Sequence, residues 1–169
     1  GRWIDGVPPL RWWTQKDESG GQLVEQSTHV FDLVRHFGGD VADLAGFGGQ
    51  RVVADEIDFP DSSVVAMCHN SGVVSQVAST SASPEKDVSL ELVADGCRLE
   101  LDLVSHTLTG TVDGEPIHVE GGDQHYEKEL AAFVEAVKTG DPSLPRSPYA
   151  DSLATFELTM DADDALDVA

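Results

Sequence analysis

The chain has 169 residues, 40% of them hydrophobic, which is enough for one domain to close a core. Its 31 acidic and ten basic side chains give a net charge of −21, which repels nucleic acid and anionic membranes and excludes both as partners. No run approaches the roughly 20 apolar residues that cross a bilayer, and the acids are spread along the chain, so we expect a folded cytoplasmic protein from a salt-rich cell.

The chain opens irregularly and then predicts a helix. Its first residues read as mid-protein sequence without a signal peptide, so we expect a domain cut from a longer chain. Residues 1–21 show neither a helical nor a strand period. From residue 27 to 37 apolar side chains recur at helical spacing, Ser27 or Thr28 can cap the start, and Gly38-Gly39 can end the helix.

Residues 41–119 are dominated by strand signals. Short runs rich in Val, Leu and Thr are separated by turn sequences such as Asp95-Gly96. The runs cover residues 62–69, 72–82, 88–94, 97–104, 107–112 and 115–120. Short connections favour an antiparallel meander over a parallel sheet. The two cysteines, Cys68 and Cys97, are too few for a disulfide framework, and we expect both to be small buried thiols.

Two helices are predicted to close the chain, over residues 124–139 and 149–166. One face of the first is apolar, and we expect it to be core. That face consists of Tyr126, Leu130, Phe133 and Val137. A helix, many strands and two helices predict an α+β fold in a single domain of residues 1–169, with one large, open, mostly antiparallel sheet and helices on one face.

The segment from Ser19 to Asp32 carries the candidate chemistry. Two glycines lead into what reads as a short apolar strand, which delivers Glu25 and then His29 at the start of the predicted helix. The positive end of the helix favours a neutral imidazole, whereas a carboxylate at Glu25 favours the charged form. A histidine balanced between the two is suited to move a proton near neutral pH. Spacing alone leaves a capping or partly buried polar role for His29 open.

His29, Asp32 and His36 also share one helical stripe, since they lie at positions i, i+3 and i+7. Two histidines and a carboxylate can bind zinc or a similar ion. The outer pair is two turns apart, about 10 Å along the axis, which is awkward for one ion. We therefore expect no metal site, and a solvated polar face for Asp32 and His36.

This segment resembles the start of the carboxy-terminal domain in the glucose–fructose oxidoreductase / inositol dehydrogenase / MocA (Gfo/Idh/MocA) family, whose members show Gly-Gly and then Asp-x-Gly-x-His-x-x-Asp. The pattern here is Glu25-x-Ser27-x-His29-x-x-Asp32, with glutamate and serine in place of aspartate and glycine. Further motifs extend the resemblance over nearly the whole chain: Asn70-Ser71-Gly72 before a strand, Tyr126-x-x-Glu129-x-x-x-Phe133-x-x-Ala136-Val137-x-x-Gly140, and Ser147-Pro148-Tyr149-Ala150-Asp151-Ser152-Leu153. It implies a Rossmann domain followed by an α+β domain, of which this chain is the second.

The resemblance implies an NAD(P)-dependent oxidoreductase that acts on a hydroxyl of a sugar, inositol or related polyol, and that is active only at full length. His29 matches the family's active-site histidine, and Glu25 stands where many members have aspartate. The family's catalytic lysine and glycine-rich cofactor loop lie in the first domain. Because the glycine cluster at residues 46–49 does not follow a strand and open a helix, we expect this chain alone to bind neither NAD nor NADP.

Substrate contacts are expected just before the motif. Trp12 and Trp13 can stack on a sugar, and Lys16 can donate to hydroxyls or pair with a carboxylate, although the tryptophans are equally suited to anchor their loop to the sheet. The alternative function is a non-catalytic sheet domain for dimerisation or carbohydrate binding, because an open sheet can bury its exposed face against a second copy. For the enzyme, too, we expect a homo-oligomer formed through the sheet.

Overall fold

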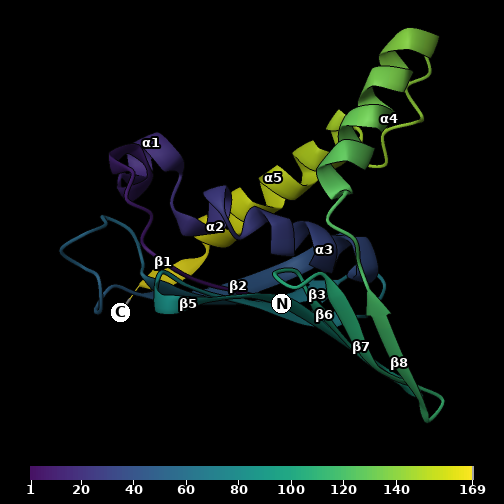
Figure 1. The fold of residues 1–169 in the computed structure, drawn as a ribbon. Coiled ribbons are helices and arrows are strands. Elements are labelled where there is room, and N and C mark those ends of the chain that lie inside the picture. Colours follow the sequence, from purple (N-terminus) through teal and green to yellow (C-terminus); the bar gives the residue numbers. More distant parts are fainter. Residues whose placement is uncertain (169) are drawn as a thin grey trace.

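The computed structural model describes residues 1–168 as one open sheet with the helices on one face (Figure 1). The strands are β1 (Arg2–Gly6), β2 (Val41–Gly49), β3 (Ser62–His69), β4 (Val74–Thr80), β5 (Ala82–Ala94), β6 (Cys97–Asp102), β7 (Thr107–Val112), β8 (Glu115–Glu120) and β9 (Leu166–Val168). The helices are η1, a 3-10 turn (Arg11–Thr14), α1 (Lys16–Ser19), α2 (Gln22–Glu25), α3 (Thr28–Gly38), α4 (His125–Thr139) and α5 (Tyr149–Asp164). The order of the nine described strands is β8-β7-β6-β5-β1-β4-β3-β2-β9, antiparallel except for the β1–β4 and β2–β9 pairs. The predicted fold class is confirmed.

The core lies between the sheet and the helices α3 and α5. Along β3, Val65 and Met67 are buried beneath the helices, whereas Val64 and Ala66 face the open side of the sheet. The rest of the buried cluster comes from both layers: Leu23, Val30, Phe31, Val34, Val77, Val88, Leu90, Leu158 and Ala162. Because one face of the sheet is buried, side-chain alternation in the sequence located most of the strands correctly.

The amino-terminal segment is more regular than the sequence predicted. Residues 2–6 form β1, which pairs with β4 in parallel and with β5 in antiparallel orientation, and η1 and α1 follow. The partners of β1 are distant in sequence, Ala78 for Arg2 and Val88 for Trp3. No local sequence pattern indicates β1, because the strand has only five residues and its pairing partners are distant along the chain.

The strand predicted after Gly20-Gly21 is instead the short helix α2. Gly20 has a φ of 80° and Gly21 a φ of 83°, left-handed values that glycine adopts without strain, and they turn the chain out of α1. Glu25 N then donates to Gly21 O at 3.0 Å in helical geometry. Leu23 is buried in the core. The apolar character of this segment therefore reflects packing of a helix rather than strand pairing.

Helix α4 forms where it was predicted, but its apolar face is not core. The four residues of that face are between 59% and 75% exposed, and Figure 1 shows the helix projecting away from the sheet. The prediction of a core face was wrong because amphipathic periodicity indicates that a helix has a partner without indicating where the partner is. No helix within residues 1–168 has both the length and the apolar character to cross a membrane.

The face of the sheet opposite the helices is divided. Its apolar part lies on β2, β3 and β4, where Phe47, Val64 and Val74 are exposed. Cys68 is also exposed there and Cys97 is half-buried, so the expectation that both are buried was wrong, and both are free thiols.

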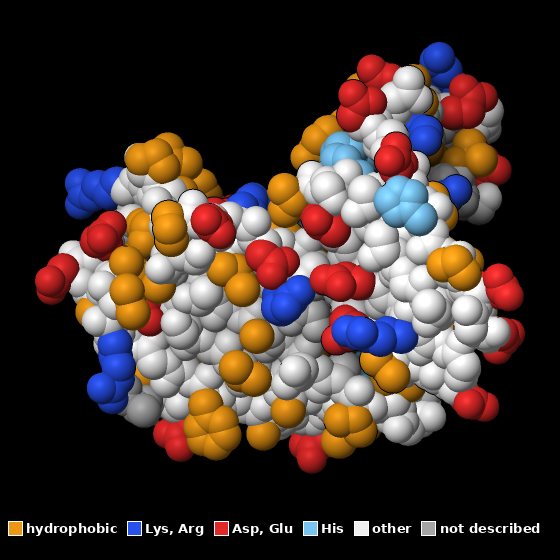
Figure 2. Space-filling view, turned by 60° about the horizontal axis from the view of Figure 1, so that its bottom comes forward, with side chains coloured by type: hydrophobic (Ala, Val, Ile, Leu, Met, Phe, Trp, Pro, Cys, Tyr) orange, Lys and Arg blue, Asp and Glu red, His pale blue; other side chains and the backbone are white. Residues whose placement is uncertain are grey.

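The charged part of this face lies on β1, β5 and β6. Arg2 pairs with Asp87 at 3.3 Å and with Glu100 at 3.4 Å, and Arg98 pairs with Glu91 at 2.7 Å. Figure 2, turned so that the underside of Figure 1 comes forward, shows apolar and charged side chains together on this side of the molecule. The open face is thus neither uniformly solvated nor uniformly apolar.

Candidate functional site

His29 lies in the first turn of α3 and is exposed. The neighbours of His29 in the sequence are anchored to the sheet and to the core. Ser27 is buried, and its hydroxyl shares a 2.7 Å hydrogen bond with that of Ser79 on β4, while Val30 and Phe31 are buried in the core. The side chain of Ser27 makes no capping hydrogen bond, so it anchors the helix start to the sheet instead of capping it.

The imidazole of His29 stacks on Trp3 of β1. The ring centroids are 5.7 Å apart and the planes are inclined by 29°. Lys86 on β5 places its Nζ 5.1 Å from the centroid of the Trp3 ring, and pairs with Asp5 at 3.1 Å. The cation–π contact with Lys86 restrains the indole ring of Trp3, and stacking on that ring restrains the imidazole of His29. Sequence reasoning missed Trp3 and Lys86, because their contacts exist only after β1 has paired within the sheet.

Glu25 is bound to Trp13 rather than to His29. Trp13 Nε1 donates to Glu25 Oε2 at 2.6 Å, and among the described residues no hydrogen bond joins Glu25 to His29. Trp13 is 1% exposed and packs edge-on against Phe59, with centroids 5.3 Å apart. Of the two roles that the sequence left open for Trp13, this geometry favours the anchoring one. Glu25 therefore holds the segment that leads into α3.

Trp12 and Lys16 have different surroundings although they are close in sequence. Trp12 is 44% exposed, so its ring is accessible to a ligand. Lys16 Nζ pairs with Asp163 of α5 at 2.7 Å, which is the carboxylate contact among the alternatives that the sequence allowed. Of the three predicted substrate contacts, Trp12 presents the exposed aromatic surface.

A buried carboxylate, Asp61, shapes the loop that covers Trp13. Its Oδ2 accepts the backbone N–H groups of residues 51–53 at 2.8, 2.6 and 3.0 Å. Burial alone would raise the pKa of Asp61, but these donors outweigh burial and hold the pKa below its usual value. The loop then packs Ile57 and Phe59 against Trp13 in a small second core.

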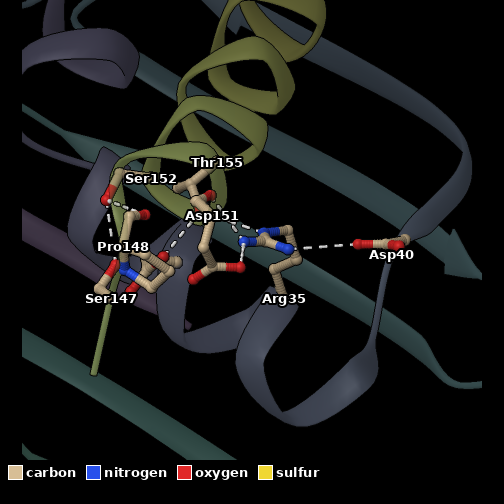
Figure 3. Close-up of polar contacts among 8 residues, drawn as sticks. Arg35, Asp40, Ser147, Pro148, Asp151, Ser152 and Thr155 are labelled. Atoms are coloured by element: carbon tan, nitrogen blue, oxygen red, sulfur yellow. Dashed lines mark hydrogen bonds and ion pairs between the residues drawn. The ribbon is translucent and has the colours of Figure 1, made fainter. Parts of the chain in front are cut away.

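Arg35, which the sequence left as a surface charge, joins α3 to α5 (Figure 3). Its guanidinium pairs with Asp151, pairs with Asp40 at 3.2 Å, and donates to the Thr155 hydroxyl at 3.1 Å. Burial alone would lower the pKa of Arg35, but the two carboxylates outweigh it and raise the pKa. Figure 3 shows the guanidinium between the start of α5 and Asp40, so the Arg35 side chain connects α3, the start of α5 and the turn between α3 and β2.

Asp32 belongs to the same contact between helices. It accepts the hydroxyl of Thr155 at 2.7 Å, so it is not on a solvated face, and that expectation was wrong. His36 is exposed, as expected. Within residues 1–168 no three His, Cys, Asp or Glu side chains are arranged to hold a metal ion. The stripe that suggested a zinc site is divided between an exposed imidazole and a helix–helix hydrogen bond.

Four buried polar atoms have no hydrogen-bond partner among the described residues: Trp3 Nε1, Gln22 Nε2, Gln26 Oε1 and Ser81 Oγ. They come from β1, from α2 and the residue after it, and from the residue between β4 and β5. Buried polar groups in proteins are usually paired. These four groups are exceptions to that rule, and two of them, Gln22 and Gln26, shortly precede His29 in the sequence.

The glycine cluster at residues 46–49 forms the end of β2 and pairs with β3, Gly46 with Val65 and Gly49 with Ser62. Its backbone belongs to a sheet and does not form the loop before a helix that cradles a pyrophosphate. A Cβ on Gly46 would lie 2.8 Å from Leu166, so close packing against β9 explains this glycine. This segment does not fit a dinucleotide.

Comparisons with known proteins agree with this architecture. Residues 1–100 match the family model described as GFO/IDH/MocA C-terminal domain. The uncharacterized protein UNK4.17 of Schizosaccharomyces pombe is 30% identical over 182 residues, which cover 88% of this chain and 42% of that protein.

Two solved structures share the fold over 98% of this chain. One is UDP-N-acetylglucosamine 3-dehydrogenase GnnA from Acidithiobacillus ferrooxidans (TM-score 0.80, 15% identity, 51% of that chain). The other is biliverdin reductase from Synechocystis sp. PCC 6803 in complex with biliverdin and NADP+ (TM-score 0.76, 16% identity, 54% of that chain). The chain spans 42% of its curated relative and about half of these structures. Because the family model covers more than half of its residues, the chain belongs to the GFO/IDH/MocA family, whose C-terminal domain it forms.

Proposed function

We propose that this chain is the substrate-binding half of an NAD(P)-dependent oxidoreductase that acts on a hydroxyl of a sugar, inositol or related polyol, with His29 as the acid–base group. The observation that carries the proposal is the exposed imidazole of His29, held against Trp3 at the start of α3. Family membership supports an oxidoreductase as the activity of the full-length protein.

The substrate class rests on a different feature. The two structural neighbours act, by their names, on a nucleotide sugar and on biliverdin, so the shared fold does not choose between such substrates. The exposed ring of Trp12 favours a sugar, because aromatic faces stack on the C–H faces of pyranose rings. Lys16 keeps its side chain partly exposed while it pairs with Asp163, so it is a weaker candidate for a hydroxyl donor.

The proposed reaction converts an alcohol into a carbonyl. In the full-length protein the amino-terminal half would hold NAD or NADP, which would supply the acceptor for the hydride of the substrate carbon. His29 takes the proton of the adjacent hydroxyl, and returns it when the reaction runs in reverse. Trp3 fixes the plane of the imidazole, and Glu25 acts through Trp13 as a positioning residue for the segment before α3.

The proposal is tested by His29→Ala in the full-length protein. We expect kcat to fall by roughly 10²–10⁴, which is the usual contribution of a positioned acid–base group. Cofactor affinity should not change, because the cofactor is assigned to the amino-terminal half. The circular dichroism spectrum should not change either, because an exposed side chain loses little packing when it is truncated. Steady-state kinetics and cofactor titration measure both quantities on the same protein.

His36→Ala is the matched control, because His36 is exposed on the same helix and contacts Phe37 rather than Trp3. Its kcat should equal that of the wild type. Unchanged kcat in His29→Ala would leave His29 only a structural role, and equal losses in both variants would contradict a specific role for His29. Glu25→Gln should lower kcat less than His29→Ala, because the amide oxygen of the glutamine can still accept the hydrogen bond that Trp13 Nε1–H donates.

The assignment of the cofactor site to the amino-terminal half has a second consequence. The 169-residue chain alone should bind neither NAD nor NADP, since residues 46–49 are part of a strand. Isothermal titration calorimetry with each dinucleotide checks this, and micromolar binding to the isolated chain would contradict the proposal.

We also propose that two copies associate through the open face of the sheet, which would serve either the enzyme or a non-catalytic dimerisation domain. The exposed side chains of Phe47, Val64 and Val74 favour this contact. Sedimentation equilibrium of the full-length protein and of Val74→Lys measures it. A wild-type monomer at all accessible concentrations would contradict it.

A further inference from the structure

A charged pair lies beside the stack of Trp3 and His29, and the reaction proposed above does not use it. Asp5 Oδ2 of β1 pairs with Lys86 Nζ of β5 at 3.1 Å, and the same Nζ lies 5.1 Å from the centroid of the Trp3 ring. The imidazole centroid of His29 lies 5.7 Å from the centroid of that indole. The charged pair and the proposed acid–base group are therefore neighbours of one aromatic ring.

The pairing of β1 with β5 places these side chains on the helix side of the sheet. Arg2 and Asp87 pair with each other on the open face. Alternation along each strand then turns the adjacent side chains, Trp3 and Lys86, to the other face. His29 belongs to the helix layer on that side, in agreement with its stack on Trp3. Lys86 and His29 thus reach the same surface of the protein.

The ladder between β1 and β5 is interrupted at the charged pair. The register shifts between Ile4 and Gly6, so that Asp5 lies opposite residues 83–86 of β5. Bulges in a ladder change the direction of side chains and are over-represented beside active sites. Here the side chain of Lys86 is 49% exposed and that of Asp5 is 26% exposed. Both charged groups are therefore accessible to a ligand.

The pair presents a hydrogen-bond donor and an acceptor in a fixed arrangement. Asp5 Oδ1 accepts the backbone N–H of Gly6 at 2.9 Å, which orients the carboxylate, and Oδ2 has a lone pair beyond the one that faces Lys86. The ammonium group has three N–H donors, of which the ion pair needs one. Two adjacent hydroxyls of a polyol fit this arrangement, because one can donate to the carboxylate while the other accepts from the ammonium group.

We infer that Asp5 and Lys86 form a substrate subsite that binds two adjacent hydroxyls of an uncharged polyol, while His29 acts on a further hydroxyl. This inference deepens the proposed function and rests on it. The pair is neutral as a unit and the chain carries a net charge of −21, so the subsite offers no net attraction to a carboxylate or a phosphate. Because Lys86 and His29 contact the same indole, a ring-sized ligand that hydrogen-bonds at both ends can span them.

Saturation-transfer-difference NMR on the full-length protein tests the inference, with D-glucose, D-galactose, D-xylose and myo-inositol as neutral probes. We expect at least one probe to bind, and Lys86→Met to weaken its binding by about ten-fold or more, because a hydrogen bond from a charged donor is lost. Asp5→Asn should weaken binding less, and Lys86→Arg, which keeps a charged donor, should retain most of the affinity. Melting temperatures confirm that each variant is folded.

Arg98→Met is the matched control. Arg98 pairs with Glu91 at 2.7 Å on the open face, so the variant also removes an exposed base from an ion pair of this sheet. Its affinity for the probe should equal that of the wild type. An equal loss in Arg98→Met and Lys86→Met would assign the effect to the charge of the whole domain and overturn the inference.

A double-mutant cycle between protein and ligand separates contact with the substrate from support of Trp3. Monodeoxy analogues of the bound probe each lack one hydroxyl. Loss of a hydroxyl that the subsite binds should weaken binding to the wild type, and should have little further effect once Lys86→Met has removed its partner. If every analogue loses as much affinity in Lys86→Met as in the wild type, the pair only holds Trp3 and the inference is overturned.

Two further results would contradict an uncharged polyol at this subsite. One is the absence of saturation transfer to any of the neutral probes, and the other is tighter binding of D-galacturonate than of D-galactose. None of these readouts depends on turnover. Binding that depends on Lys86, in a protein that does not oxidise the bound polyol, would therefore contradict the proposed function and support the subsite.

Discussion

Helices α3 and α4 have similar sequence patterns and opposite surroundings. Each has one apolar stripe at helical spacing and a glycine at its end. In α3, Val30 and Phe31 are completely buried against the sheet and α5, whereas in α4 the equivalent stripe is exposed. The pattern of α3 has its partner in the described chain, and that of α4 does not. An amphipathic period therefore predicts that a helix has an apolar face, but it does not predict whether that face is covered within the same domain.

The largest test of this comparison is a pair of phenylalanine truncations. Phe31→Ala should destabilise the 169-residue chain by about 3–5 kcal/mol, the cost of deleting a fully buried aromatic side chain. Phe133→Ala should cost less than about 0.5 kcal/mol, because it removes no packing in this chain. Urea unfolding measures both, and a cost at Phe133 comparable to that at Phe31 would mean that α4 is packed after all.

The next test concerns the side chain that secures the packed helices to each other. Arg35→Met should destabilise by about 3 kcal/mol, because it leaves the Asp151 carboxylate and the Thr155 hydroxyl without their shared donor at a partly buried position. Arg11→Met, at an exposed position, is the control and should be close to neutral. If both variants unfold at the same urea concentration, the Arg35 network contributes nothing to the junction of α3 and α5.

Asp61 extends the comparison to the loop that covers Trp13. Asp61→Asn should destabilise by about 2 kcal/mol, because three backbone donors lose a charged acceptor. The pKa of Asp61 is lowered in the folded state, so its stabilising effect is complete above the unfolded-state value of about 3.9 and is lost as the pH falls through the folded-state value. The difference in unfolding free energy between wild type and variant should therefore be constant from pH 7 to 5 and shrink below pH 4. A difference that grows towards acid pH would contradict this sign.

The smallest expected effect is that of salt on the whole domain. The net charge is −21, and lowering the salt from 1 M to 0.1 M lengthens the Debye length from about 3 Å to about 10 Å. Repulsion between carboxylates should then lower Tm by about 2–4 °C, which corresponds to about 1 kcal/mol. Differential scanning calorimetry across this range checks the proposed adaptation to high salt, which a Tm that rises on desalting would rule out.

The sequence predicted the elements that depend on local signals. Alternation and Asp-Gly turns located β6, β7 and β8, and helical spacing located α3, α4 and α5 within a few residues. It also placed His29 at the start of a helix. It did not predict β1, because the partners of that strand are distant along the chain, and for the same reason it missed the stack of Trp3 on His29.

The role of Arg35 was missed for a related reason. Nothing near Arg35 in the sequence shows that α5 will bring Asp151 beside it. Likewise, Glu25 was expected to act on His29, and only the folded loop shows that Trp13 takes up its carboxylate. Pairwise contacts between side chains from separate elements depend on the tertiary structure, so a single sequence gives their residue types but not their pairing.

The central position of β1 has a consequence for the order in which the domain assembles. β1 lies between β5 and β4, so the strands β5–β8 and the strands β2–β4 with β9 share no ladder of their own in the described sheet. Each group can form through neighbouring hairpins, but the two become one sheet only when β1 enters between them. Pairing over long sequence separation is slow, so this joining step is expected to limit the folding rate. During synthesis β1 must therefore wait as an unpaired strand until β4 has emerged, and its other edge stays open until β5 follows, although β1 precedes every other strand described here.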